Sequence, residues 1–564
     1  MASTTPQNNA RELTSQLWAM ANDLRAKMDA SEYRDYILGF IFYRYLSKRQ
    51  ERNLASSAPL DFTDSEISSN PQDVNNAYAR QVAQDGIEDW REELASEQGY
   101  AIDPEYTWTT IVNKVHDQTI RPEDYPNMFA QFKANALLNT NATEDFKDVF
   151  DNINLSDSSL GNSVSARAKA LSQLVERIDS IDFHDDSGHD ILGDVYEYLI
   201  AEFAGASGKK AGEFYTPHEV SRVLAKLVTY VSHDSSEEAK EVIEHASRPF
   251  MVYDPTMGSG SLLLTVQHEL KSETDNPDTA RVHFFGQEIN RTTYNLARMN
   301  LMMHDVKYQY MDLRCADTLE SDWPNGMDEN GIDHPEFFDA VVANPPYSLK
   351  WDNAESKLKD PRFKDYGKLA PKSKADYAFV EHGIYHLKPS GRMAIVLPHG
   401  VLFRGAAEGT IRKAIIDKNY LDAVIGLPSN LFYSTGIPTV ILVFRKDRKT
   451  NDVLFIDASQ HFEKDKKQNR LREEDIDLIL ETYKNRQDVD KLAHVATLEE
   501  IKDNDYNLNI PRYVDTFEEE EPIDLDDVNR QLAEVDEEIA RLEKELEAML
   551  AELVPTDQND EDDE

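Results

Sequence analysis

Cysteine is almost absent from this sequence, and so are long apolar runs. Cys315 is the only cysteine among 564 residues, which excludes an internal disulfide framework and fits a reducing cytoplasm. The longest apolar stretches, such as the one around Phe40, are short and interrupted by charges, so we expect no membrane span. The first residues contain no basic stretch followed by an apolar core and do not predict a secretory signal.

Basic residues are far outnumbered by acidic ones. The chain has 60 Lys and Arg against 105 Asp and Glu, which gives a net charge of −45. Such a balance repels a polyanion unless the charges are segregated along the surface. Any contact with a nucleic acid is therefore local or supplied by a partner, and most of the acidic surface is interpreted as a source of solubility.

The pattern of apolar residues predicts four parts. Residues 1–200 have apolar positions at three- and four-residue spacing and hardly a glycine, which indicates an all-helical domain. In residues 201–460 short apolar strands such as "PFMVYD" and "TVILVFRK" alternate with helices. This alternation predicts an α/β domain whose parallel-dominated, Rossmann-like sheet carries helices on both faces. A helical or irregular extension over 461–515 and a C-terminal part over 516–564 complete the chain.

The C-terminal part contains a heptad repeat followed by an acidic tail. Its apolar positions, spaced alternately three and four residues apart, are Leu525, Val528, Leu532, Val535, Ile539, Leu542, Leu546, Met549 and Leu553. This spacing predicts a coiled-coil helix, which Pro555 ends. The apolar seam can fold back on its own domain, but a strict 3.5-residue period favours a partner helix because it selects a long, narrow contact.

A glycine-rich turn follows the first expected strand of the sheet, in "YDPTMGSGSLLLTVQHEL". The small residues Gly258, Ser259, Gly260 and Ser261 let the backbone approach a ligand closely, and the N–H groups of the next helix face it. A single turn of this kind is weak evidence for a nucleotide site, because glycine turns are common.

Carboxylates at the ends of neighbouring strands strengthen this interpretation. Glu288 follows about one βαβ unit later, where a ribose diol is normally bound, and Asp317 ends a third strand, where it can accept a hydrogen bond from an adenine amino group. No Gly-Lys-Ser/Thr follows the turn, so a nucleoside without a polyphosphate fits best. We therefore predict S-adenosylmethionine, whose cationic sulfonium favours a nearby carboxylate such as Asp254.

The stretch "GEFYTPHEV" precedes the glycine-rich turn. Thr216 as N-cap, Pro217 at the first helical position and Glu219 three residues after the cap predict a capping box, which is a structural role. Phe214 and Tyr215 can wall a cofactor pocket, although packing in the core explains them equally well.

A strand that runs into "ANPPYS" is the strongest catalytic signal. Two prolines stop the strand, and we predict that the side-chain carbonyl of Asn344 and the backbone carbonyl of Pro345 accept the two hydrogens of a planar –NH₂ group, while Pro346 stiffens the corner. Two such acceptors restore a directed lone pair on a poorly nucleophilic amine. Tyr347 offers a ring on which an extruded base can stack. A simple strand-ending turn is the alternative.

Two further stretches give weaker signals. The loop after the Asn-Pro-Pro-Tyr corner carries eight basic residues, Lys350, Lys357, Lys359, Arg362, Lys364, Lys368, Lys372 and Lys374. They are either phosphate contacts or a solvated loop. The stretch "HDDSGHD", His184 to Asp190, lacks a cysteine partner and helical histidine spacing, so we interpret it as a polar loop and predict no catalytic metal.

Seven motifs together resemble a known family. "LWAMANDLRAKMDASEYRDYILGFIFYRYLS", "DILGDVYEYLIAEFA", "GEFYTPHEV", "DPTMGSGSLL", "GQEIN", "ANPPYS" and "LPHGVLFRG" resemble, in this order, the modification subunit of bacterial type I restriction-modification systems, an adenine-specific DNA methyltransferase. The resemblance covers about residues 10–450. It implies an S-adenosylmethionine-dependent methyltransferase sheet, a cofactor pocket that includes Glu213 to His218, Ser259 to Ser261 and Glu288, and a catalytic motif at Asn344 to Tyr347.

The family also implies partners. Two such subunits join one specificity subunit, which reads double-stranded DNA, and a restriction subunit can bind the complex in the bacterial cytoplasm. After the sheet ends near Ser459 the sequence contains no second large basic domain to read base edges. We expect the heptad helix to dock the specificity subunit.

Other functions are compatible with some of these motifs. An Asn-Pro-Pro-Tyr corner suits any planar –NH₂ group, so methylation of a glutamine amide in a protein or of an amino group in ribosomal RNA is a rival reaction. A scaffold that binds the cofactor without catalysis is an alternative of another class. The N-terminal helical part, the coiled-coil helix and the length of the chain count against the rival enzymes.

Overall fold

The computed structural model describes most of the chain: residues 30–56, 60–63, 65–183, 192–206, 215–231, 235–244, 247–273, 282–320, 322, 332, 334–432, 435–465, 468–516 and 525–551. It divides into two units, Met1–Val514 and Asp515–Glu564, which are described separately. Among the described residues, no helix combines the length and the apolarity that crossing a bilayer requires.

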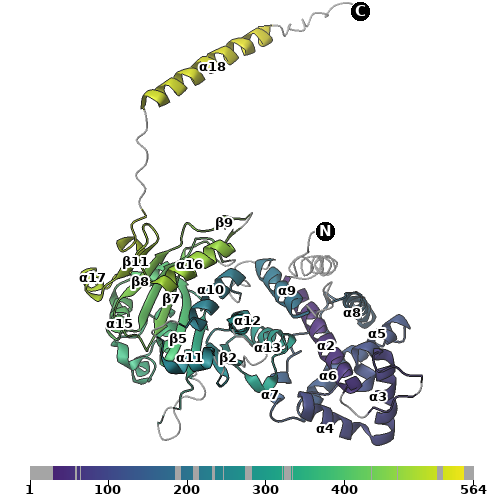
Figure 1. The fold of residues 1–564 in the computed structure, drawn as a ribbon. Helices are drawn as coiled ribbons and strands as arrows, with labels where there is room; N and C mark the ends of the chain where they lie inside the picture. The colour runs from purple at the N-terminus through teal and green to yellow at the C-terminus, as the bar shows by residue number, and fades with distance from the viewer. Residues whose placement is uncertain are drawn as a thin grey trace, which may run out of the picture. The chain divides into compact units, whose positions relative to one another are not determined.

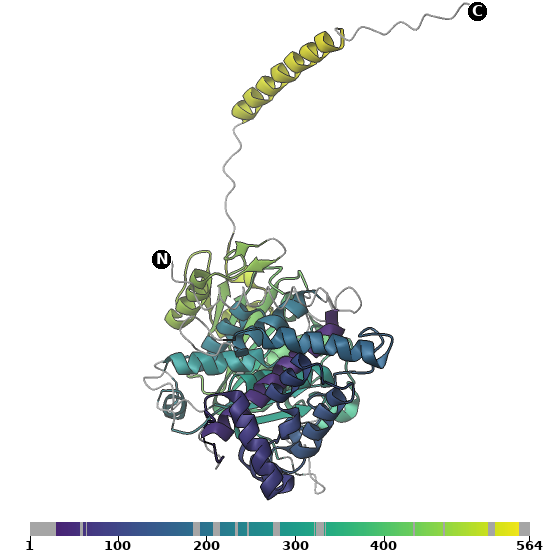
Figure 2. The same ribbon diagram turned by 90° about the vertical axis from the view of Figure 1, so that its right-hand side faces the viewer.

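The described residues before Phe250 form helices and turns without a strand. The N-terminal helices are α2 (Ala30–Ser56), α3 (Pro71–Asp85), α4 (Ile87–Gln98), α5 (Trp108–His116), α6 (Asp124–Ala136), α7 (Thr143–Phe146), α8 (Val164–Asp179) and α9 (Leu192–Ala206). Figure 1 and Figure 2 show the purple and blue helices of this part packed together. Polar N-caps begin several of them: the side chains of Asn70, Thr107 and Ser163 accept hydrogen bonds from the first turns of α3, α5 and α8.

Nine strands form one mixed sheet in the order β11-β8-β6-β7-β5-β4-β1-β2-β3. Their bounds are β1 (Phe250–Asp254), β2 (Val282–Glu288), β3 (Met311–Cys315), β4 (Phe338–Ala343), β5 (Leu387–Pro398), β6 (Leu421–Gly426), β7 (Thr439–Arg445), β8 (Val453–Asp457) and β11 (Ala493–Ala496). The run β5-β4-β1-β2-β3 is parallel, and so is β6-β8, whereas β7 and β11 are antiparallel to their neighbours. A short hairpin, β9 (Glu463–Lys464) and β10 (Asn469–Arg470), follows β8.

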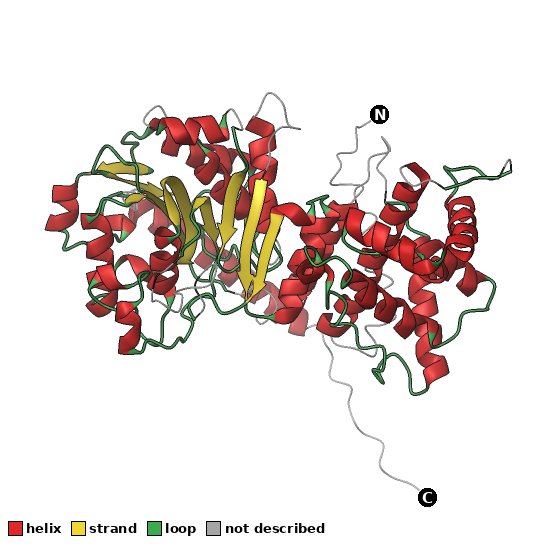
Figure 3. Ribbon diagram, turned by 90° about the horizontal axis from the view of Figure 1, so that it is seen from below, coloured by secondary structure: helices red, strands yellow, loops and turns green. Residues whose placement is uncertain are grey.

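Helices cover both faces of this sheet, as the sequence predicts, and Figure 3 shows red helices around the yellow strands. Successive strand side chains point to opposite faces, so Val252 and Val342 belong to one hydrophobic core, and Tyr253 and Val341 belong to the other. The first core includes residues of α10 (His218–Thr229), α12 (Ser261–Glu273), α13 (Arg291–Met303) and α16 (Glu473–Asn485). The second includes residues of α14 (Asp376–Tyr385) and α15 (Ala406–Asp417). The short helices α11 (Glu237–Ile243) and α17 (Leu498–Asp503) complete this unit.

Helix α13 joins the N-terminal helices to the sheet. Arg298 is buried and donates through Nη1 to the carbonyl oxygens of Glu144, Asp145 and Lys147, at 2.7, 3.0 and 2.9 Å. The first hydrophobic core likewise contains side chains from both parts. A domain boundary near residue 200 therefore stays a prediction, because both sides belong to one compact unit.

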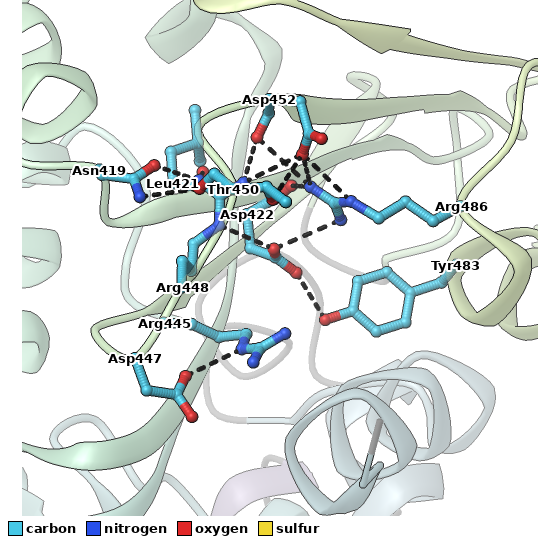
Figure 4. Close-up of polar contacts among 10 residues, drawn as sticks. All are labelled: Asn419, Leu421, Asp422, Arg445, Asp447, Arg448, Thr450, Asp452, Tyr483 and Arg486. Carbon is cyan, nitrogen blue, oxygen red and sulfur yellow. Dashed lines mark hydrogen bonds and ion pairs between the residues drawn. The ribbon is translucent and has the colours of Figure 1, made fainter. Parts of the chain in front are cut away.

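A cluster of ion pairs fixes the sheet edge at which β6 and β8 begin (Figure 4). Asp422 is 2% exposed and lies 3.0 Å from Nε of Arg448 and 3.3 Å from Nη1 of Arg486. Its Oδ2 also accepts a hydrogen bond from the hydroxyl of Tyr483, at 2.7 Å. Because β6 is parallel to β5 and β4 in direction, this edge is opposite to the carboxyl end of β4.

The second unit contains α18 (Leu525–Ala551), as the heptad repeat predicts. Its described apolar seam is exposed, from 39% at Val528 to 68% at Met549. Leu553 and Pro555, with which the sequence ends the helix, lie outside the described residues.

Candidate active site

The carboxyl ends of β1 and β4 lie side by side, because these strands are parallel neighbours. Here residues that follow the two strands line one pocket. The residues that line it are Thr216, Asp254, Thr256, Met257, Ser259, Ser261, Leu262 and Asn344. The predicted catalytic Asn344 thus shares one pocket with residues predicted for the cofactor.

The glycine-rich turn contributes Ser259 and Ser261 to the lining of the pocket, and its glycines have backbone conformations that favour glycine. Gly258 and Gly260 have φ of +54° and +77°, which a residue with a Cβ rarely adopts. A Cβ on Gly260 would lie 2.5 Å from Cδ1 of Leu301 on α13. The side chain of Asn300, also on α13, donates to the carbonyl oxygen of Ser259 at 3.0 Å. Helix α13 therefore holds the turn against the start of α12, where Ser261 is the first residue.

Two carboxylates flank this turn. Asp254, at the end of β1, is 2% exposed, and burial raises its pKa to about 7 although the backbone N–H of Thr256 donates to it. Glu288, at the end of β2, accepts from the backbone N–H of Asn290 at 2.7 Å. Burial raises the pKa of Glu288, and hydrogen bonds from backbone N–H groups, including that of Gly258, oppose this rise. Of the two carboxylates, Asp254 lines the pocket and Glu288 does not, so a contact between Glu288 and a ribose stays a prediction.

Asp317 does not line the pocket. Its Oδ1 accepts from the backbone N–H of Leu319 at 2.9 Å, which closes a local turn after β3. The neighbouring Thr318 donates its hydroxyl to the carbonyl oxygen of Pro255 at 2.5 Å. The loop that carries Asp317 therefore lies beside the loop that follows β1, and a contact between its carboxylate and an adenine stays a prediction.

The predicted capping box at Thr216 is wrong. Pro217 is the N-cap of α10, His218 is the first helical residue, and no side chain caps the helix. Instead, Oγ1 of Thr216 accepts a hydrogen bond from Nδ2 of Asn344 at 3.1 Å. The hydroxyl of Thr216 therefore contacts Asn344, at the end of β4, and does not cap α10. Tyr215 is buried in the first hydrophobic core, and Glu213 and Phe214 lie outside the described residues.

The Asn-Pro-Pro-Tyr corner begins directly after β4 ends at Ala343. The hydroxyl of Tyr347 donates to Oδ1 of Asn344 at 2.9 Å, so the amide of Asn344 is oriented from both sides. Pro345 is buried and Pro346 is partly buried. The ring of Tyr347 meets Phe432 edge to face, with 6.2 Å between the centroids. Burial raises the pKa of Tyr347, so its hydroxyl keeps its proton at neutral pH.

Sequence reasoning missed several residues of this pocket. Thr256, Met257 and Leu262 line it from within the quoted glycine-rich stretch, so their position in the motif could have indicated them. Asn300 and Gln287 support the turn: the carbonyl oxygen of Gln287 accepts from the N–H of Met257 at 2.9 Å. No local pattern marks Asn300, because it lies 41 positions from the residue that it contacts.

The basic loop divides into structural and exposed residues. Lys357 pairs with Glu320 at 2.5 Å, and Arg362 is 2% exposed and bonded to Asp360 and to the carbonyl oxygen of Thr318. As candidate phosphate contacts, these two are wrong, because their charges are already used inside the protein. The exposed lysines of the loop are Lys350, Lys359, Lys364, Lys368 and Lys372.

One group of metal-ligating residue types occurs in the described part of the chain. Ligand atoms of Asp322, His382 and His386 lie within 4.8 Å of one another. However, Nη1 of Arg362 lies 3.2 Å from Nδ1 of His382, and Nε2 of His386 already meets Asp322 at 2.7 Å. A guanidinium at this distance repels a cation, so the group is better explained as a buried polar network. The stretch from His184 to Asp190 lies outside the described residues.

Comparison with known proteins identifies the family. The profile of the "N-6 DNA Methylase" family matches residues 187–522, and the profile of the "HsdM N-terminal domain" matches residues 13–178. The chain belongs to the N-6 DNA methylase family. The methylase is 34% identical over 568 residues to the type I restriction enzyme MpnII methylase subunit of Mycoplasma pneumoniae, covering 98% of this chain and 96% of the relative. It is also 34% identical over 342 residues to the HindI methylase subunit of Haemophilus influenzae, covering 59% and 70%.

A solved structure agrees. The type I restriction-modification system methyltransferase subunit from Streptococcus thermophilus is 43% identical, with a TM-score of 0.77 over 90% of this chain and 100% of that chain. The methylase is thus an adenine-N6 DNA methyltransferase that uses S-adenosylmethionine, and a modification subunit of a type I restriction-modification system. The predicted family, fold class and reaction are confirmed. The protein, RNA and scaffold alternatives are set aside.

Proposed function

We propose that Asn344 and Pro345 activate the target adenine for methyl transfer. The carbonyl oxygens of these two residues accept the hydrogens of the exocyclic amine, which directs its lone pair toward the methyl donor. The supporting observation is that Asn344 lines the same pocket as Ser259 and Ser261 of the glycine-rich turn. In this proposal, the site of the target adenine is therefore adjacent to the site of the methyl donor.

The neighbours of Asn344 have orienting roles in this proposal. Thr216 accepts from the amide nitrogen, so the amide oxygen is turned toward the other side. Tyr347 occupies one lone pair of that oxygen at 2.9 Å, and a carbonyl oxygen has a second lone pair for the amine. The ring of Tyr347 is the candidate surface for stacking an adenine that has left the duplex, with Pro346 keeping the corner rigid.

The residues of the pocket fit S-adenosylmethionine. When bound, this cofactor supplies an electrophilic methyl group on a cationic sulfur. The described lining residues include one carboxylate, Asp254, and no Lys or Arg, which suits a cation and disfavours a polyphosphate. We assign the ribose to Glu288, the adenine to Asp317, and the backbone contacts to residues 258–261, and we propose that residues 213–218 also take part in binding the cofactor. We propose no catalytic metal.

Three observations support the proposed partners: the similarity to type I methylase subunits, the exposed seam of α18 and the exposed lysines. We propose that two copies join one specificity subunit, that a restriction subunit can bind this complex, and that the exposed lysines of the loop after Tyr347 contact phosphates of duplex DNA. The assembly would work in the bacterial cytoplasm, where its DNA substrate lies.

We propose that α18 docks a helix of the specificity subunit. Between Val528 and Met549 the seam is exposed, and every charged residue at the positions that flank it is acidic: Asp536, Glu538, Glu543 and Glu545. In either orientation, a second copy of α18 would place like charges opposite one another. A helix with Lys or Arg at its flanking positions fits instead.

The test uses the methylase together with its specificity subunit, labelled S-adenosylmethionine and duplex DNA that contains the target site. We expect Asn344→Ala to lower the rate of methyl transfer by about 10²–10³-fold and to leave the dissociation constant of the cofactor nearly unchanged. Asn353→Ala is the matched control, because that amide donates to the carbonyl oxygen of Ala370 in the adjacent loop. Unchanged methylation of DNA by Asn344→Ala would refute the assignment.

A further inference from the structure

The residue that follows the Asn-Pro-Pro-Tyr corner has an unusual backbone. Ser348 has a φ of +53°, in the left-handed region that residues with a Cβ disfavour. Such a conformation persists only where surrounding contacts fix it. The corner therefore ends on a strained residue that something else in the protein must hold.

The side chain that holds it is Asp376, the first residue of α14. Its Oδ1 accepts the backbone N–H of Ser348 at 2.8 Å, and its Oδ2 accepts from Nη2 of Arg404 at 2.5 Å. Arg404 in turn donates through Nε to Glu408 at 2.5 Å. Asp376 is 1% exposed and Glu408 is 2% exposed. Both oxygens of the Asp376 carboxylate are thus engaged, in a chain of charges whose two carboxylates are buried and whose arginine is partly exposed.

Backbone hydrogen bonds join the same two segments. The N–H of Ala375 donates to the carbonyl oxygen of Leu349 at 2.9 Å, and that of Trp351 donates to Lys372 at 3.1 Å. They begin only after Ser348, so Asp376 provides the contact nearest to the corner. At the other end of the corner, Thr216 holds the amide of Asn344. The four catalytic-motif residues are consequently fixed at both ends by side chains from distant parts of the sequence.

We infer that Asp376, oriented by Arg404, is a positioning residue for methyl transfer. It keeps the backbone from Asn344 to Tyr347 in the conformation that presents the two acceptors to the target amine. This inference rests on the proposed role of the corner. Its physical basis is that a displacement of about 1 Å at a reacting centre can lower a rate about 10²-fold, although Asp376 itself touches neither the cofactor nor the base.

The experiment compares Asp376→Ala, Asp376→Asn and Arg404→Ala in the complex with the specificity subunit. Asp376→Ala removes the acceptor of Ser348, so we expect kcat to fall about 10²-fold with the cofactor dissociation constant within about twofold. Asp376→Asn keeps one oxygen acceptor, for which the N–H of Ser348 and the guanidinium of Arg404 compete, and should recover part of that loss. Arg404→Ala leaves the acceptor in place but frees the carboxylate to turn, and should give an intermediate kcat.

Asp422→Asn is the control, because Asp422 is also a buried aspartate paired with arginines, at the opposite edge of the sheet. It should lower the melting temperature without changing kcat below the melting temperature. If Asp376→Ala behaves like this control, or if Asp376→Asn is as slow as Asp376→Ala, the inference is overturned. If Asp376→Ala does not fold, wild-type kcat in Arg404→Ala overturns it.

The wild-type complex and Asn344→Ala are measured in parallel. If Asn344→Ala keeps full activity, the proposed function of the corner has failed. If Asn344→Ala is inactive while Asp376→Ala remains fully active, only the positioning role has failed.

Discussion

At the scale of single residues, we propose that Asp254 makes cofactor binding dependent on pH. Its pKa is raised to about 7, chiefly by burial, so about a tenth of the molecules carry the carboxylate at pH 6 and about nine tenths at pH 8. Only the ionised form attracts a sulfonium. We expect the affinity for S-adenosylmethionine to rise up to about tenfold between these pH values, as measured by equilibrium binding.

The demethylated product provides the control for this prediction, because its thioether carries no positive charge. Its affinity should change less over the same pH range. Asp254→Asn should flatten the dependence for S-adenosylmethionine. An identical pH dependence for both ligands in the wild type would contradict a contact between Asp254 and the sulfonium.

The candidate site residues that the structure brings together are those in compact motifs. Ser259, Ser261 and Asn344 meet in one pocket because each follows a strand of the same parallel sheet, and parallel strands place their carboxyl ends together. The hydrogen bond between Thr216 and Asn344 was not predictable, since it joins residues 128 positions apart. A local capping rule gave Thr216 a role that the tertiary contact replaced.

At the scale of elements, the cluster around Asp422 ties β6 to the loop after β7 and to α16 (Figure 4). Burial raises the pKa of Asp422, but three arginines and a hydroxyl together outweigh burial, so the pKa lies below its usual value. These groups are Arg486, Arg448, Arg445 and the hydroxyl of Tyr483. The stability that the ionised Asp422 contributes is fully present above the pKa of this residue in the unfolded chain. It is lost as the pH falls through the lower pKa of Asp422 in the folded protein. We expect Asp422→Asn to destabilise the protein by about 3–5 kcal/mol at pH 7, measured by urea denaturation.

The destabilisation should shrink when the same comparison is made at pH 3, because the Asp422 carboxyl of the unfolded wild-type chain is then largely protonated, which favours unfolding of the wild type. Asp417→Asn serves as the control, since its partner Lys413 is half exposed and the pair lies at the surface. If Asp417→Asn lowers the free energy of unfolding by the same amount, the arginine cluster does not stabilise the protein more than a surface ion pair does.

Elements with continuous apolar runs were the most predictable. The strands β1, β4, β5, β6 and β7 coincide with short apolar segments because nearly all of their residues are buried by helices on both faces. The strand β11, with the sequence "AHVA", was not expected within the extension over 461–515. It is a four-residue edge strand whose pairing with β8 depends on the tertiary fold.

At the scale of the whole molecule, the excess of acidic charge has a direct consequence for assembly. The described part of α18 exposes apolar residues flanked by acidic ones, so the helix should resist pairing with itself while it accepts a partner with basic flanks. A partner with basic residues would also offset the net charge of −45 on this chain. We propose that the specificity subunit supplies most of the positive surface that contacts DNA.

Reversing the flanking charges should exchange these preferences. The variant carries Asp536→Lys and Glu543→Lys. In a parallel pair of wild-type α18 helices, Glu543 of one copy lies opposite Glu538 of the other, and the two repel. In the variant, the lysine introduced at position 543 attracts that Glu538. We expect self-association to tighten by about tenfold, as two repulsions become two attractions of about 0.3–0.5 kcal/mol each, and capture of the specificity subunit to weaken.

The control carries Glu537→Lys and Glu547→Lys, which change the net charge equally at positions away from the seam. Sedimentation velocity and co-purification measure both effects, and equal behaviour of the two variants would show that the flanking charges do not select the partner.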